Sequence, residues 1–387
     1  MIRYAAAGQT APHLFSAIIA CAIPIVILGG GALAANYLER KTIHQTAPKD
    51  FFIKNQGLAF QRAAAHAPDV LLFYGSSELI DPIPNRASDF FSSEPSGFQV
   101  CPVGKAGTTS LIILQKVGAL GGDLRGRKIA ISLSPSSFST PAVSPHAYAA
   151  NFSLGAASGL LFGSALNSNL KADIAKRMLN FPDTLRKSAL LELAANCIAS
   201  NHPRDRIVLA VLWPLGRLQN AVFDLQDHFE ALVYILGNRN NMLLPDARSA
   251  HPRKTPGNNA GVAASTESFS AAGSGPDAGF RERIATAKEW TDLELLFRTL
   301  TDLNAHPFIL SMPVDTAYHW GKGVSRNARQ LYYDKLRELA GQYRFPVIDF
   351  DDHDTDSDFL IARKEHPSPQ GWMYYNRALN DFFHAPK

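Results

Sequence analysis

Two residues near opposite ends of the sequence could together perform nucleophilic catalysis. Ser77 follows the apolar run of residues 69–74 through a Gly-Ser turn, and glycine takes such a turn without a Cβ clash. His366 stands in a loop just before a Pro-Ser-Pro segment and a final helix-like stretch. A histidine within reach of a serine hydroxyl can remove its proton and make it a nucleophile. The pair predicts acyl transfer through a serine; the alternatives are a helix-capping serine and a solvated loop histidine.

Three groups could bind the oxyanion that such a reaction forms. The backbone N–H of Ser77 opens the segment after the turn, Gly107 lies in a glycine turn after the second apolar run, and Ser136, with Ser137 as the alternative, follows the third run. Preorganised donors of this kind stabilise the charge that develops on a carbonyl oxygen. We expect Ser77, Gly107 and Ser136 to form an oxyanion site, with ordinary strand-to-helix turns as the alternative explanation for the last two.

An alternation of short apolar runs with longer helical stretches predicts the elements that position these residues. We expect an α/β fold, a three-layer α/β/α sandwich around a mainly parallel five-stranded sheet. In such a sheet the carboxyl ends of the strands meet at one edge, where Ser77, Gly107 and Ser136 would lie. The predicted strands are residues 69–74, 97–103, 128–133, 307–312 and 345–350. The predicted helices are residues 108–120, 165–180, 184–200, 205–236, 282–303, 325–341 and 369–383.

The N-terminal region predicts one transmembrane helix. Residues 14–35 hold 22 consecutive positions without a charged side chain, and a helix of that length crosses the hydrocarbon core of a bilayer. The segment is either an uncleaved signal anchor or a signal peptide that ends at the A-x-A-like site of residues 32–34. Residues 205–236 are also apolar, but arginines and aspartates interrupt them, so they predict a soluble helix.

The composition along the chain predicts the remaining domain organisation. We expect residues 1–13 to be a short N-terminal segment, residues 36–65 a linker and residues 66–387 one domain. Residues 246–279 are rich in Ala, Ser, Gly and Pro and contain few large apolar side chains. This predicts a flexible insertion in the domain.

The composition also excludes several classes of protein. The 387 residues are 46% hydrophobic and 19% charged, which is typical of a globular chain. The net charge is only +4 and no run of five like charges occurs, so we expect no nucleic-acid partner. Phosphate-loop, dinucleotide-binding and common zinc motifs are missing, and three cysteines are too few for a four-cysteine zinc site. We therefore expect no cofactor and no metal.

The blocks around the candidate residues resemble the SGNH/GDSL hydrolase superfamily and, more closely, the DltD family of membrane-anchored acyl-transfer proteins. The resemblance covers most of the chain from about residue 66 to the end. It rests on residues 75–79 (GSSEL), 107–111 (GTTSL), 133–135 (LSP) with Phe138, and 366–372 (HPSPQGW). By that resemblance Ser77 is the nucleophile, His366 is the base, and Gly107 with the Ser77 amide forms the oxyanion hole.

The resemblance also implies where the protein acts and with what. Such proteins have one N-terminal anchor and a catalytic domain outside the cytoplasmic membrane. This outweighs the lysines and arginines after residues 14–35, which alone would favour a cytoplasmic domain. The implied reaction passes a D-alanyl or other small acyl group to a polysaccharide, and the alternative is a polysaccharide or lipid O-acyl esterase. The implied partners are a membrane-bound O-acyltransferase, an acyl carrier or acylated intermediate, and a cell-surface glycan or an exopolysaccharide such as cellulose.

Two positions depart from the family's pattern. The aspartate that usually stands three residues before the histidine is replaced by Arg363. We expect Asp358, the nearest upstream aspartate, to orient the ring of His366, with a backbone carbonyl as the alternative. A Gln-Trp pair after the Ser-Pro turn is replaced by two serines, of which Ser136 is the first. These departures leave room for a non-catalytic accessory factor that docks a carrier or glycan to the membrane O-acyltransferase.

Overall fold

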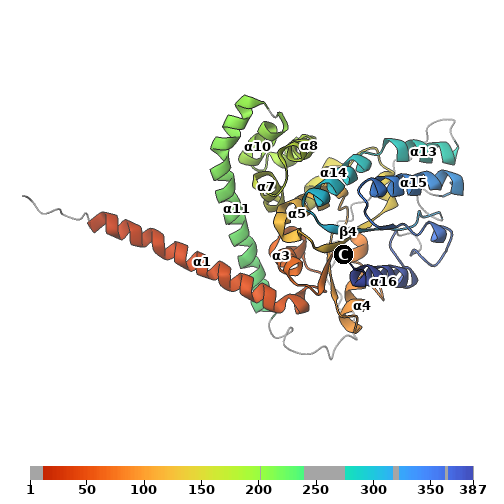
Figure 1. Ribbon diagram of the computed structural model, residues 1–387, viewed down its shortest axis with the longest axis horizontal. Helices are drawn as coiled ribbons and strands as arrows, with labels where there is room; N and C mark the ends of the chain where they lie inside the picture. Colours follow the sequence, from red (N-terminus) through yellow and green to blue (C-terminus); the bar gives the residue numbers. More distant parts are fainter. Residues whose placement is uncertain (1–11, 201, 239–274, 317–321, 362–364, 387) are drawn as a thin grey trace, which may run out of the picture.

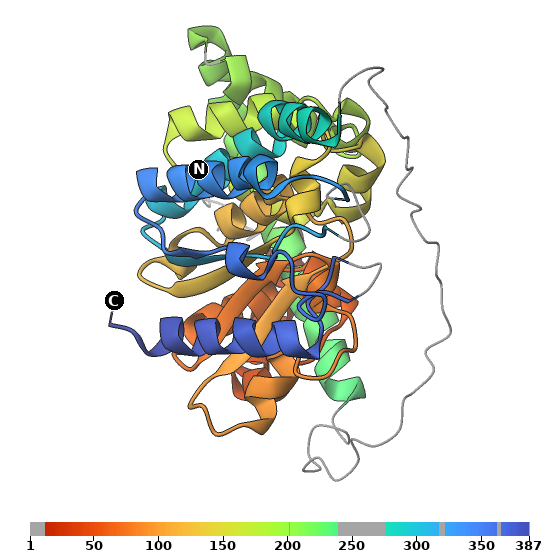
Figure 2. The same ribbon diagram turned by 90° about the vertical axis from the view of Figure 1, so that its right-hand side faces the viewer.

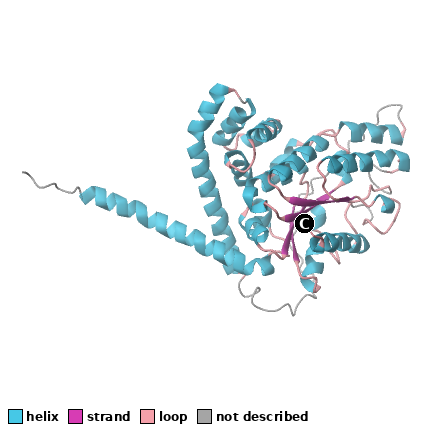
Figure 3. Cartoon of the chain, viewed as in Figure 1, coloured by secondary structure: helices cyan, strands magenta, loops and turns pink. Residues whose placement is uncertain are grey.

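The computed structural model describes residues 12–200, 202–238, 275–316, 322–361 and 365–386. At its centre five parallel strands form one sheet in the order β2-β1-β3-β4-β5, with helices on both faces (Figure 3). The predicted α/β fold with a five-stranded parallel sheet is confirmed. The strands are β1 (Val70–Gly75), β2 (Gln99–Gly104), β3 (Lys128–Leu133), β4 (His306–Ser311) and β5 (Val347–Ile348).

All seven predicted helices are present, two of them divided, and α1 contains the predicted membrane segment; the short helices α2, α3, α4, α6 and α7 were not predicted from the sequence. The predicted helix 184–200 is α9 and α10, because the Ser188 hydroxyl accepts the N–H of Leu191 and caps a new helix. The predicted helix 282–303 is α13 and α14, because the N–H of Lys288 donates to the carbonyl of Pro141 at 3.1 Å. The helices are α1 (Pro12–Thr46), α2 (Phe52–Gln56), α3 (Ala59–His66), α4 (Ala87–Ser93), α5 (Ser110–Leu120), α6 (Pro145–Asn151), α7 (Leu154–Phe162), α8 (Ser168–Met178), α9 (Pro182–Leu185), α10 (Ala189–Ser200), α11 (Pro203–Gly237), α13 (Pro276–Thr286), α14 (Glu289–Asp302), α15 (Arg326–Gln342) and α16 (Pro369–His384), with the 3-10 turns η1 (Ser77–Leu79), η2 (Gly121–Leu124), η3 (Pro135–Phe138) and η4 (Asp351–His353).

The two faces of the sheet bury alternate residues of each strand, because successive side chains point to opposite faces. Along β1, Leu71 and Phe73 pack in a cluster with residues of α4 and α16. Leu72 and Tyr74 point into the larger cluster, which includes residues of α5, α14 and α15. Every residue of β1 is buried, as expected for a central strand that is covered on both sides.

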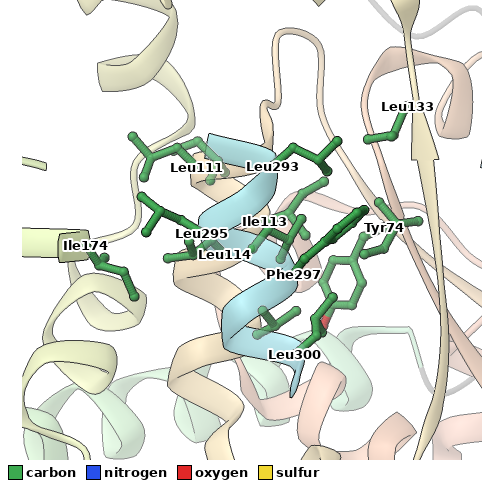
Figure 4. Packing of buried hydrophobic residues seen from close by; sticks show 14 of the residues in the cluster. Tyr74, Leu111, Ile113, Leu114, Leu133, Ile174, Leu293, Leu295, Phe297 and Leu300 are labelled. Carbon is green, nitrogen blue, oxygen red and sulfur yellow. The ribbon is translucent and has the colours of Figure 1, made fainter. Parts of the chain in front are cut away.

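Helices α5 and α14 form the centre of the larger cluster (Figure 4). Leu111 and Leu114 of α5, Leu293 and Phe297 of α14, and Tyr74 of β1 are all fully buried there. Burial of one such side chain stabilises the fold by about 1.5–3 kcal/mol. This packing fixes the strands whose carboxyl ends carry the candidate site residues.

Helix α1 is longer than the predicted membrane segment, and its last turns belong to the domain. It is the one helix among the described residues that is long and apolar enough to cross a membrane. Its first part stands away from the rest of the chain (Figure 1). Ala35, Glu39 and Ile43 are buried at four-residue spacing, which places them on one helix face, and α1 packs there against α3 and α11.

Residues 36–65, which we expected to be a linker, are instead part of the folded domain. Beyond the end of α1 they include α2 and α3, and Phe60 is buried against α11. The Asp227 carboxylate of α11 accepts the N–H groups of Leu58 at 2.5 Å and Ala59 at 2.6 Å and so caps α3. These two helices are too short and too poor in large apolar residues to produce a clear helical period in the sequence.

Two sequence predictions fall largely outside the described residues. Residues 246–274 of the expected insertion are not described, and its last residues, from Pro276 on, begin α13. The expected N-terminal segment of residues 1–13 is described only from residue 12.

Candidate active site

Close backbone contacts fix the turn after β1. Gly75 and Gly104 are paired at the ends of β1 and β2. A side chain at Gly104 would bring its Cβ within 2.6 Å of the carbonyl oxygen of Ser76. The N–H of Ser76 donates to Oε1 of Glu78 at 2.9 Å. These contacts hold the chain in a sharp turn from the strand into η1, which begins at Ser77.

The loop before α16 brings His366 to this turn. Leu360 and Pro367 form an antiparallel bridge across the loop, and the hydroxyl of Ser368 caps α16. Nε2 of His366 lies 2.8 Å from Oγ of Ser77. The structure therefore brings together the two residues that the sequence singled out for nucleophile and base.

The other ring nitrogen of His366 contacts Asp81 and not Asp358. Its Nδ1 lies 2.6 Å from Oδ2 of Asp81. Asp358 is exposed, and its main-chain carbonyl accepts a hydrogen bond from the hydroxyl of Ser368. Asp358 thus holds the loop that carries the histidine, and the expectation that its carboxylate orients the ring is corrected in favour of Asp81.

The turn that presents Ser77 also positions Asp81. The N–H groups of Ile80 and Asp81 both donate to the carbonyl of Ser77 at 3.2 Å. Residues four apart on such a helical turn share one face. The spacing of Ser77 and Asp81 was therefore a signal in the sequence, but a search for carboxylates upstream of the histidine does not find it.

This arrangement sets the roles that the three side chains can take. A His366 ring that donates its Nδ1 proton to Asp81 has Nε2 unprotonated and directed at the hydroxyl of Ser77. The side chains of His366 and Asp81 are 14% and 24% exposed. The contact is thus partly sheltered from water while the serine stays within reach of a ligand.

Two predicted oxyanion donors have backbone N–H groups that donate to no other protein group among the described residues; they belong to Ser77 and Gly107. The hydroxyl of Ser76 donates to the carbonyl of Lys105 at 3.3 Å, which ties the loop of Gly107 to the turn that carries Ser77. Gly107 has a φ of +77°, which glycine adopts readily. A role for the two N–H groups in oxyanion binding stays a prediction.

The third predicted donor, Ser136, lies after β3, on the other side of β1 from Gly107. Its Oγ is 2.8 Å from Oγ of Ser134, which donates to a carboxylate oxygen of Glu365 at 3.0 Å. Glu365 directly precedes His366. The Ser136 hydroxyl is thus joined to the histidine loop, and a role for it in oxyanion binding stays a prediction.

A buried carboxyl lies directly beneath the site. Glu78 is only 1% exposed, and burial raises its pKa above the usual value. The hydrogen bond from the N–H of Ser76 and the charge of His366 partly oppose this rise in pKa. Glu78 therefore accepts a hydrogen bond from the turn that carries Ser77 and interacts electrostatically with His366.

Metal-binding chemistry has no candidate cluster in the part of the chain that the structure describes. No group of three or more His, Cys, Asp or Glu side chains there is placed to hold a metal ion. The three cysteines are free thiols.

The sequence matches the family described as DltD protein over residues 52–276 and 277–384. The chain belongs to the DltD family. Protein DltD of Bacillus subtilis (strain 168) is 24% identical over 382 residues, which cover 93% of this chain and 96% of that relative. Protein DltD of Staphylococcus aureus (strain NCTC 8325 / PS 47) is 21% identical over 331 residues, which cover 79% of each chain.

Membership in the DltD family confirms the resemblance that the GSSEL and HPSPQGW segments indicated. The match begins at residue 52 and thus includes α2 and α3. This agrees with the structure, in which the folded domain of this DltD-family protein begins before residue 66.

Proposed function

We propose that this protein is a membrane-anchored serine acyl-transfer enzyme that acts on a cell-surface or exported polysaccharide. One observation carries the proposal: two short contacts connect Oγ of Ser77, the ring of His366 and the carboxylate of Asp81, at 2.8 Å and 2.6 Å. In serine hydrolases of unrelated folds, a serine, a histidine and a carboxylate in such contacts act as nucleophile, general base and orienting group.

The first half of the reaction forms an acyl-enzyme. Oγ of Ser77 attacks the carbonyl carbon of an acyl ester or thioester, and its proton passes to Nε2 of His366. The N–H groups of Ser77 and Gly107 bind the oxyanion. The tetrahedral intermediate then releases the alcohol or thiol, which takes the proton from His366, and the acyl group remains on Ser77.

The second half transfers the acyl group. A polysaccharide hydroxyl attacks the acyl carbonyl and gives its proton to His366, and Ser77 leaves with that proton. Attack by water in place of the polysaccharide would make the protein an O-acyl esterase with the same residues. A site that must admit a polysaccharide has to be open to solvent at the serine, and Ser77 is only partly buried.

The resemblance to acyl-transfer proteins of the family supports a D-alanyl or other small acyl group and three classes of partner: a membrane-bound O-acyltransferase, an acyl carrier or acylated intermediate, and a cell-surface glycan or exopolysaccharide. In this proposal α1 crosses the cytoplasmic membrane and the domain lies on its extracytoplasmic side. The contact of Asp81 with His366 weighs against the accessory-factor alternative, which rested on Arg363 in place of an aspartate.

A turnover assay with an isotopically labelled D-alanyl thioester and a polysaccharide acceptor tests the proposal. Full-length protein in vesicles should move label into the polysaccharide, and Ser77→Ala and His366→Ala should each abolish this transfer. Ser92→Ala, which removes an exposed serine of α4, is the matched control and should retain it. Release of free acid alone would make the protein an esterase. The absence of both turnover and an acyl-enzyme in folded parent protein would contradict the proposal.

A further inference from the structure

Helix α11 exposes a continuous apolar face. Nine of its side chains are between 40% and 69% exposed, whereas only four other large apolar side chains are exposed among the described residues outside α1. At 100° per residue the nine fall within an arc of about 100°, one side of the helix. We call this set the apolar stripe; it consists of Ile207, Val208, Val211, Leu215, Leu218, Val222, Phe229, Val233 and Leu236. Patches of this length on a protein surface mark a contact with a partner or a membrane.

Six of the seven charged residues of α11 lie outside the arc of the apolar stripe, and the seventh, Arg204, stands in the first turn of the helix. Two of its four acidic side chains contact the rest of the domain: Asp224 pairs with Arg62 at 3.4 Å, and Asp227 caps α3. The basic side chains of Arg204 and Arg206 in the first turn, and of Arg217 further along the helix, are exposed. One apolar face, with charged residues around the rest of the circumference, is typical of a helix that lies in the surface of a bilayer.

The position of α1 relative to α11 fits the same surface. The C-terminal half of α11 packs on the end of α1, where His228 contacts Glu39 at 2.8 Å, just after the apolar part of α1. In Figure 1, α1 leaves the domain on the side that α11 covers, and the two helices run in strongly different directions. In the turned view of Figure 2, green parts of α11 show at the top and at the lower right, so the helix again spans the height of the domain. A bilayer that α1 crosses would therefore lie along α11.

We propose that α11 is an in-plane membrane helix, with its apolar stripe in the headgroup region of the bilayer that α1 crosses; this rests on the membrane anchoring in the proposed function. The charges of residues 205–236 argue against a second span, and the exposure of the stripe argues against a buried core helix. A single anchor lets a domain rotate about the membrane normal and tilt. A second contact along α11 holds the domain, and with it the Ser77 site, at one orientation above the lipid.

Depth measurements on the full-length protein in vesicles of phosphatidylethanolamine and phosphatidylglycerol test this. A Cys21→Ser background removes the exposed native cysteine, since Cys101 and Cys197 are buried. Nitroxide labels are placed in separate variants at Leu218→Cys in the stripe, Val26→Cys in α1 and Met373→Cys on the exposed face of α16. A label that collides mainly with oxygen lies in lipid, and a label that collides mainly with a water-soluble nickel chelate lies in solvent.

The proposal predicts that labels at 218 and 26 collide with oxygen at least several-fold more, relative to nickel, than the label at 373. A label at 218 that behaves like the label at 373 overturns it. A label at 218 that is shielded from both reagents, with spin–spin broadening, indicates a second copy of the chain and also overturns it. A solvent-exposed label at 26 removes the anchor and this proposal together. Acyl-enzyme formation at Ser77, measured in the same vesicles, tests the proposed function independently of these labelling results.

Discussion

Asp81 and His366 contact each other at 2.6 Å, although 285 positions separate them in the sequence. Asp81 comes from the same short turn as Ser77, so one segment presents the proposed nucleophile and the carboxylate, and a second segment presents the proposed base. In the family pattern the carboxylate stands three residues before the histidine, where this chain has Arg363. The carboxylate therefore reaches the ring from a different part of the chain.

Replacing Asp81 should separate this arrangement from one that uses Asp358. Asp81→Asn removes the charge that holds the Nδ1 proton of His366 and should lower the acylation rate by about 10³–10⁴-fold, as loss of this carboxylate does in serine proteases. Asp358→Asn, at an exposed position, is the control and should stay within about twofold of the parent. Acylation rates with a chromogenic ester measure both. The reverse order of the two effects would remove Asp81 from the proposed triad.

The close approach of two strand ends makes Gly104 sensitive to any side chain. In Gly104→Ala the new Cβ would meet the carbonyl oxygens of Ser76 at 2.6 Å and Gly75 at 3.1 Å. We expect a loss of about 1–3 kcal/mol in the free energy of unfolding, together with loss of acylation, because the nucleophile turn must shift. Gly341→Ala in α15 has no atom within 4 Å of its Cβ and serves as the control. Equal melting temperatures for the two variants would show that the turn tolerates the shift.

The buried carboxyl of Glu78 should act as an acceptor for the turn. Glu78→Leu leaves the partly buried N–H of Ser76 without its acceptor, which costs about 1–3 kcal/mol of stability. Glu78→Gln keeps a carbonyl oxygen within reach of that N–H and should lose much less stability. Burial raises the pKa of the Glu78 carboxyl and so favours its neutral form, which the amide resembles. Denaturant unfolding of both variants compares the two losses. Similar losses would mean that the charge of Glu78 matters and the hydrogen bond does not.

The junction of α1 and α11 should depend on pH through His228. Its hydrogen bond to Glu39 raises the pKa of His228 above 6.5, burial opposes this, Asp227 adds to the rise, and Arg62 lowers the pKa. Because the pKa of His228 is raised in the folded state, the charged pair contributes fully to the free energy of unfolding below pH 6.5. This contribution is lost as the pH rises through the folded-state pKa of His228.

The parent should therefore exceed His228→Gln in melting temperature by more at pH 6 than at pH 8.5. The same two proteins at the two pH values supply the control, because effects common to both cancel in the difference. A difference in melting temperature that does not change with pH would contradict the ionic contribution of this pair.

The sequence was most informative where burial is complete. Strands such as Lys128–Leu133 are covered on both faces and appear as continuous apolar runs, so their positions could be predicted closely. The strand predicted at residues 345–350 shrinks to Val347–Ile348, because it lies at the edge of the sheet and is only partly covered. Helix α3 was missed because its burial depends on contacts with α1 and α11 that no local period records.

The site was predictable only as far as its residues mark recognisable elements. Ser77 follows a strand and His366 precedes a proline-started helix, and both positions can be inferred from neighbours in the sequence. The orienting role proposed for Asp81 depends on where the Leu360–Pro367 bridge places His366 relative to the turn that carries Ser77. Tertiary packing sets that placement, so the sequence alone favoured Asp358, the nearest upstream aspartate, over Asp81 as the carboxylate that contacts the ring.

The central claim is that Ser77 is a nucleophile activated by His366, and covalent labelling with a fluorophosphonate followed by peptide mass mapping tests it most directly. The account predicts one adduct, on Ser77, which Ser77→Ala and His366→Ala abolish in protein that remains folded. An adduct on Ser76 or elsewhere, or no adduct on the folded parent protein, would contradict it.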